Sequence, residues 1–256
     1  EAAVPALDAA TAAHAREVFI EGARAGLRAD IFAKLGDSIT ESGSYLTDIG
    51  HGWFDLGPWS RLESVVRYYR RRSPSDNPES NSFTRASGAA EAGWTTNTLL
   101  GPNNRMITEL TTTRASIAIL MIGTNDAERS NIETYTRNLE EIVRRIEAQH
   151  VVLALSTIPD QQSSPEAAAL GLRINEAVRR VAAEHHLPLI DYWAALQGLP
   201  NNGVHSDRVH PSIYAPNNNP SGGILTDAAI EYGYNMRNLT TLLMLERLMQ
   251  ALDLHP

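Results

Sequence analysis

The chain has 256 residues, of which 43% are hydrophobic, and its formal net charge is −8. This length and apolar content suit one domain with a sizeable core. The acidic balance gives no electrostatic support for a nucleic-acid partner. The absence of cysteine excludes disulfides, thiol nucleophiles and thiolate metal sites, and no apolar run reaches the roughly 18 residues that a membrane span needs.

The N-terminal part is rich in alanine, and its pattern predicts a helix over about residues 7–27. The chain begins at Glu1 without an initiator methionine. This start suggests a mature secreted or cell-surface form whose signal peptide is gone, although the residues leave the compartment undecided. They also leave the oligomeric state open.

Apolar runs predict five strands, which are separated by helical patterns. The predicted strands cover residues 31–35, 82–86, 116–122, 151–155 and 187–190, with the second the weakest. The clearest helical pattern covers 131–149, where Leu139, Ile142, Val143 and Ile146 share one face. Further helices are predicted over about 166–186 and 226–252.

Strands that alternate with helices at this interval predict parallel pairing with right-handed crossovers. We therefore expect an α/β fold, a three-layer α/β/α sandwich with a central five-stranded parallel sheet. No internal repeat or linker is visible, so residues 1–256 are expected to form a single domain. Two long segments, about 41–58 and 201–223, lack periodicity, and loops of such length are usually functional or mobile.

The first predicted strand ends at Gly36-Asp37-Ser38. This break places a serine hydroxyl at the carboxyl end of a strand, where open α/β sheets form their ligand crevice. Glycine, aspartate and serine also favour ordinary turns and helix caps. The role of Ser38 therefore depends on partners further along the chain.

Three other segments follow predicted strands: Gly93, Asn125, and the run from Asp207 to Pro211. In a parallel sheet the carboxyl ends of the strands lie along one edge, so these segments are expected to meet Ser38 there. A nucleophilic serine needs a base, an acid that orients the base, and donors for the oxyanion. His210 can act as the base, and Asp207, three residues earlier, can hold one of its ring nitrogens.

The expected oxyanion donors are the backbone N–H groups of Ser38 and Gly93 and the side-chain amide of Asn125. Glycine permits close approach, and the asparagine amide carries donors without a titrating charge. Each segment also has a simpler interpretation. Asp207 and His210 could cap a loop, Asn125 could belong to a strand-to-helix turn, and Gly88 competes with Gly93.

Together these segments resemble the conserved blocks of the SGNH, or GDSL-type, serine hydrolases. The blocks are Gly36-Asp37-Ser38-Ile39, Gly93, Gly123-Thr124-Asn125-Asp126 and Asp207-Arg208-Val209-His210-Pro211, over about residues 30 to 212. The resemblance implies a flavodoxin-like fold and a serine esterase with no metal or other cofactor. It also implies Ser38, Asp207 and His210 as catalytic residues and Ser38, Gly93 and Asn125 as the oxyanion hole. Ile39 replaces the leucine of the family motif.

We therefore expect a serine hydrolase that cleaves carboxylic esters, either short acyl chains or acetyl groups on a carbohydrate, through an acyl-enzyme on Ser38. Asp37, Trp94 and Thr124 are expected to line its pocket. One alternative is an acyltransferase with the same three residues. The other is a carbohydrate-binding protein without catalytic activity, which would have no need of all three. The natural substrate and its acyl length lie beyond the sequence.

Overall fold

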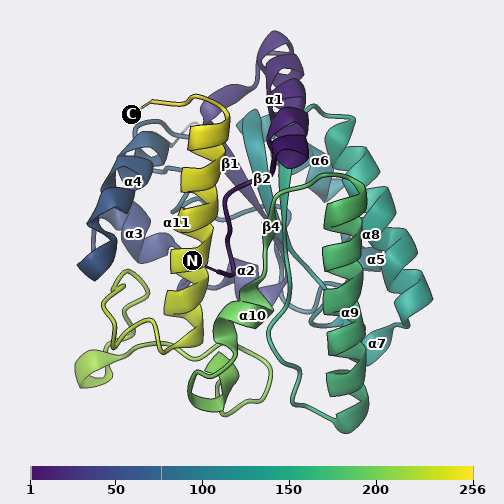
Figure 1. The fold of residues 1–256 in the computed structure, drawn as a ribbon, viewed down its shortest axis with the longest axis vertical. Helices are drawn as coiled ribbons and strands as arrows, with labels where there is room; N and C mark the ends of the chain where they lie inside the picture. The colour runs from purple at the N-terminus through teal and green to yellow at the C-terminus, as the bar shows by residue number, and fades with distance from the viewer. Residues whose placement is uncertain (1, 76, 256) are drawn as a thin grey trace.

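A computed structural model describes residues 2–75 and 77–255 of the chain. A parallel sheet lies at its centre, with helices on both sides (Figure 1). The strands are β1 (Arg28–Gly36), β2 (Ala115–Met121), β3 (Val152–Ser156) and β4 (Leu189–Ile190), paired in that order. The expected α/β architecture is therefore confirmed.

The helices vary in length from short turns after the strands to long amphipathic segments. The α-helices are α1 (Ala9–Arg24), α2 (Ser38–Glu41), α3 (Thr47–His51), α4 (Glu63–Arg70), α5 (Thr96–Leu99), α6 (Arg105–Thr113), α7 (Asp126–Arg129), α8 (Ile132–Glu147), α9 (Pro165–Glu184), α10 (Tyr192–Leu196) and α11 (Gly233–Ala251). Three 3₁₀ segments, η1 (Gly57–Leu62), η2 (Pro200–Gly203) and η3 (Pro216–Asn218), lie within the long connections. The segment expected as a loop over 41–58 thus contains α3.

Helices α6, α8 and α9 cover one face of the sheet, and α1, α4 and α11 cover the other (Figure 1). This division follows from right-handed crossovers, because α8 and α9 connect strands that advance in the same direction across the sheet. Helix α11 is buried almost all round, since α1, α4 and α10 pack against it. One cluster of buried apolar side chains extends from Val4 to Leu252, which supports our proposal of a single domain.

The expected fifth strand over 82–86 is wrong. In the described residues that part of the sheet edge is reduced to one parallel bridge, between Gly36 and Ala90. The reason is local: the Asn81 carboxamide oxygen accepts the N–H groups of residues 83 and 84 and so holds a turn. The Ser82 hydroxyl then accepts the Phe32 N–H that a strand would have paired. Side-chain hydrogen-bond acceptors here take the place of the backbone hydrogen bonds that would pair a strand.

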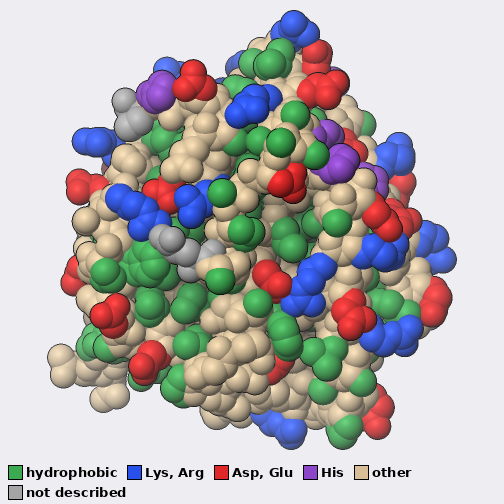
Figure 2. Space-filling model, viewed as in Figure 1, with side chains coloured by type: hydrophobic (Ala, Val, Ile, Leu, Met, Phe, Trp, Pro, Cys, Tyr) green, Lys and Arg blue, Asp and Glu red, His purple; other side chains and the backbone are tan. Residues whose placement is uncertain are grey.

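Acidic and basic side chains are interspersed over the face that carries α9, α10 and α11, so charge of one sign is not concentrated there (Figure 2). Among the described helices, none combines the length and the apolar character required to cross a membrane. The last helix begins at Gly233, seven residues later than the pattern of 226–252 predicts, because residues 226–232 form turns.

Candidate active site

The turn that carries Ser38 is built by its two preceding residues. Gly36 ends β1, and a side chain there would collide with the Met121 carbonyl of the neighbouring strand. Asp37 caps the following helix, because its Oδ1 accepts the Ile39 N–H at 3.0 Å. Ser38 is the first residue of α2, so its hydroxyl stands at the carboxyl end of the sheet.

Ser38, His210 and Asp207 form one continuous chain of hydrogen bonds. Ser38 Oγ lies 3.0 Å from His210 Nε2, and His210 Nδ1 lies 2.8 Å from Asp207 Oδ2. A carboxylate can only accept, so Nδ1 carries the imidazole proton and Nε2 is left as an acceptor for the serine hydroxyl. The three residues predicted from the sequence are therefore together in the structure.

The loop around His210 is held by hydrogen bonds within the loop itself. The Asp207 Oδ1 accepts the N–H groups of Val209 and His210 at 3.0 and 2.9 Å, and the His205 N–H donates to the His210 carbonyl at 2.8 Å. Burial raises the pKa of Asp207, but these two backbone N–H groups and the His210 ring outweigh it, so the pKa lies below its usual value. The carboxylate therefore stays ionised at neutral pH.

Asn125 and Gly93 occupy two adjacent loops at the same sheet edge. Asn125 follows β2, and its Nδ2 donates to the Trp94 carbonyl at 2.9 Å. Gly93 adopts φ +79°, a left-handed conformation that favours glycine. Its carbonyl accepts the Arg129 guanidinium at 3.1 Å. The amide of Asn125 retains a second N–H beyond the one that holds this loop.

The loop of residues 91–96 is anchored on both sides. The Ala92 N–H donates to Glu41 Oε2 at 2.8 Å, which ties the loop to the helix of Ser38. On the other side the Thr96 N–H and hydroxyl both donate to Asp126, the residue after Asn125. These bonds hold Gly93 between the two segments with which it was expected to act.

Hydrogen bonding distinguishes the backbone N–H groups of Gly88 and Gly93. The Gly88 N–H donates to the buried carboxylate of Glu109 at 3.0 Å, so it is not free for a ligand. By contrast, the backbone N–H groups of Gly93 and Ser38 have no protein acceptor among the described residues. This difference favours Gly93 as the oxyanion donor.

The three residues expected to line the pocket differ in position. Asp37, within the serine turn, and Thr124, after β2, are buried, so their side chains are closed off from a surface pocket. Burial raises the pKa of Asp37 to about 6, although the N–H of residue 39 and the Arg237 charge lower it. Trp94 is the exception, because it borders a cavity of about 380 Å³ with Arg105, whose guanidinium lies 4.5 Å from its ring centre.

Arg237 belongs to the site but was missed at the level of sequence. It is 3% exposed, and its Nη1 and Nη2 donate to the Ile39 carbonyl and the Thr40 hydroxyl at 2.6 and 2.8 Å. Its guanidinium also lies 3.6 Å from the centre of the Tyr45 ring. The signal in the sequence is weak, because Arg237 lies among asparagine and threonine residues at the start of an apolar-rich helix, and this pattern does not say where its charge points.

A serine, a histidine and an aspartate joined by hydrogen bonds form the constellation that recurs in serine hydrolases of several folds. Here it lies at the carboxyl edge of a parallel sheet. The model of the GDSL-like lipase/acylhydrolase family matches residues 35–213. The chain belongs to this family and is a carboxylic ester hydrolase.

Solved structures show the same fold. A lipase/acylhydrolase from Enterococcus faecalis is 20% identical, with a TM-score of 0.53 over 86% of this chain and 95% of that one. An alpha/beta hydrolase enzyme from the metagenome of Lake Arreo, Spain, is also 20% identical, with a TM-score of 0.57 over 85% and 95%. An acetylxylan esterase from Geobacillus stearothermophilus is 17% identical, with a TM-score of 0.53 over 84% and 93%. A search of curated proteins found no match.

Proposed function

We propose that the protein hydrolyses carboxylic esters through an acyl-enzyme on Ser38. The observation that carries this proposal is the unbroken chain from Ser38 Oγ through the His210 ring to the Asp207 carboxylate, with steps of 3.0 and 2.8 Å. A nucleophile within hydrogen-bond reach of a base, which a third group orients, is the signature of an activated serine.

In the first half of the reaction Ser38 Oγ forms a bond to the ester carbonyl carbon, and its proton moves to His210 Nε2. Asp207 stabilises the imidazolium that results. The proton then passes to the alcohol oxygen as the ester C–O bond breaks, which leaves the acyl group on Ser38. Water attacks the acyl-enzyme in the second half, again with His210 as base, and releases the acid.

The negative charge on the carbonyl oxygen would be stabilised by three donors: the N–H groups of Ser38 and Gly93, and the amide of Asn125. Two free backbone N–H groups and a neutral amide suit an oxyanion hole, because they are already oriented and need no reorganisation when the charge develops. Replacing Asn125 by alanine should lower kcat by roughly 10²–10³, the cost of one oxyanion donor.

For the substrate we propose short acyl or acetyl esters on a carbohydrate. An acetylxylan esterase is among the structural neighbours, which supports this class without deciding it. The side chains of His210 and Asp207 are 40% and 45% exposed, so water, the acceptor that hydrolysis requires, reaches the base. Product analysis with added acceptor alcohols distinguishes hydrolysis from acyl transfer, since a transferase would form new esters.

The decisive experiment is turnover of p-nitrophenyl acetate by Ser38→Ala and His210→Ala. Each should lose several orders of magnitude in kcat while circular dichroism and Tm stay close to those of the parent. The matched control for Ser38→Ala is Ser206→Ala, which alters a serine in the exposed loop that carries His210. The matched control for His210→Ala is His255→Ala, which alters a histidine with an aspartate partner at the far end of the chain. Full activity in Ser38→Ala would refute the proposal.

A further inference from the structure

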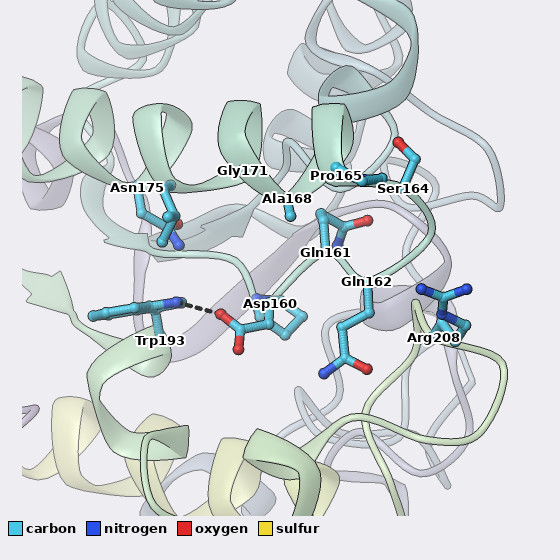
Figure 3. A pocket seen from close by; sticks show the side chains of 12 residues that line it. Asp160, Gln161, Gln162, Ser164, Pro165, Ala168, Gly171, Asn175, Trp193 and Arg208 are labelled. Atoms are coloured by element: carbon cyan, nitrogen blue, oxygen red, sulfur yellow. Dashed lines mark hydrogen bonds between the residues drawn. The ribbon is translucent and has the colours of Figure 1, made fainter.

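A second cavity adjoins the loop that carries Asp207 and His210. It has a volume of about 520 Å³ and lies between the first half of α9, the loop of residues 159–164 after β3, and Trp193 of α10 (Figure 3). This volume falls in the range of about 300–1,000 Å³ typical of small-molecule sites. None of the residues assigned to the ester chemistry lines it.

The cavity shares one wall with the candidate active site. Arg208 lines the cavity and stands between Asp207 and His210 in the chain, and two residues span at most about 7 Å of backbone. The Arg208 carbonyl accepts the Gln162 N–H at 3.1 Å, which joins the cavity loop to the loop of the base. A molecule in the cavity therefore contacts the loop that carries the base.

Two side chains at the cavity have unused hydrogen-bonding capacity. Gln161 is 3% exposed, and neither atom of its carboxamide has a partner among the described residues. A buried unpaired amide is costly, and its terminal torsion turns easily, so a ligand can engage both of its atoms. Arg208 is exposed, and its guanidinium has no hydrogen bond or ion pair within the described part of the chain; it lines the same cavity (Figure 3).

The remaining lining mixes acceptors with an apolar surface. Both oxygens of Asp160 are bound by neutral donors, Trp193 Nε1 at 2.6 Å and Asn202 Nδ2 at 2.7 Å, which fixes the carboxylate at the cavity wall (Figure 3). Ala168 and Leu172 of α9 supply apolar surface on the opposite side. The carboxylate disfavours an anionic ligand, and the polar groups disfavour an acyl chain.

We propose that this cavity binds a sugar unit of the substrate remote from the ester that is cleaved. Hydroxyl groups both donate and accept, so they can satisfy the Gln161 amide, the Arg208 guanidinium and the Asp160 carboxylate together, while the apolar ring face packs on α9. The subsite rests on the proposed function. Binding energy from such a remote unit positions the ester, and oligosaccharide esters should therefore be better substrates than small ones.

The test compares monoacetylated xylotetraose with p-nitrophenyl acetate as substrates, using the ratio of their kcat/KM values. Gln161→Leu removes the amide at similar volume, and Arg208→Gln removes the charge. Each should lower the ratio at least tenfold relative to the parent. Gln161→Leu should keep or raise Tm, because the lost amide was unpaired. Gln250→Leu and Arg137→Gln, at exposed helix positions, are the matched controls.

A ratio within twofold of the parent in both variants would overturn the subsite, as would a parent enzyme with no preference for acetylated xylotetraose over acetylated xylose. A second measurement is calorimetric binding of unacetylated xylotetraose to Ser38→Ala, with and without Gln161→Leu. We expect at least a tenfold weaker Kd in the double variant, and equal Kd values would contradict the proposal. Failure of the proposed function looks different, because Ser38→Ala would then still turn over both esters.

Discussion

The carboxylate of Asp207 contacts His210 twice from within one turn: Oδ2 lies 2.8 Å from the ring Nδ1, and Oδ1 accepts the backbone N–H at 2.9 Å. One side chain thus fixes both the position of the histidine and the tautomer of its ring. The backbone bond is formed by a neighbour in sequence, so the geometry does not depend on a distant element.

Asp207→Asn should lower kcat for p-nitrophenyl acetate by about 10²–10⁴. The asparagine amide can donate to Nδ1, which moves the ring proton to Nε2 and removes the acceptor that Ser38 needs. The matched control is Asp253→Asn, which alters an exposed aspartate in contact with His255 at 3.0 Å. Equal kcat values for the two variants would show that Asp207 has no role in orienting the base.

Gly93→Ala should lower kcat more than it lowers stability. The site is sterically open, with the Arg129 guanidinium the nearest group at 3.7 Å, but φ is +79°. A left-handed alanine costs about 1–2 kcal/mol, and relief of that strain would turn the N–H away from the oxyanion. Gly88→Ala is the informative comparison, measured by kcat and by urea unfolding. A larger loss of kcat in Gly88→Ala would show that Gly88, rather than Gly93, is the oxyanion donor.

Arg237→Lys should lower kcat by about 10–100-fold with little change in KM. One ammonium group cannot reproduce the two-pronged contact with the Ile39 carbonyl and the Thr40 hydroxyl, and small displacements of a nucleophile are costly. Arg247→Lys, on the same helix, is the control. If Tm falls while kcat stays within twofold of the parent, Arg237 contributes only to stability.

Asp37→Asn should change how stability depends on pH. The pKa of Asp37 is raised by burial to about 6 from an ordinary value of 3.8, so the native state binds this proton more tightly than the unfolded chain does. Between about pH 4 and 6 the free energy of unfolding therefore falls as pH rises, by at most about 1 kcal/mol per pH unit. The free energy of unfolding of Asp37→Asn should lack this decline.

Urea unfolding of the parent and Asp37→Asn at several pH values from 4 to 7 measures the effect. Other carboxylates titrate in both proteins, so the difference between the two curves isolates Asp37. Asparagine can still accept the Ile39 N–H, which keeps the cap of α2. Parallel curves would mean that the native pKa of Asp37 is not raised.

Local patterns were sufficient where a single segment determines its own structure. The apolar run over 116–122 can only be stable when buried on both faces, and it forms β2. Ser38 follows a strand and precedes a helix because Gly36 and Asp37 impose that turn. The weak run over 82–86 failed because its strand pattern competed with the side-chain acceptors of Asn81 and Ser82, and those bonds are invisible until the neighbours are placed.

By itself the sequence determined the family, the parallel α/β fold, and which serine, histidine and aspartate would meet, since strand ends in a parallel sheet share one edge. Only the tertiary structure decided which glycine N–H is free, that Arg237 from the last helix holds the serine turn, and that Gln161 and Arg208 border one cavity. Those outcomes depend on which partners long-range packing supplies to each polar group. No local sequence pattern specifies these partners.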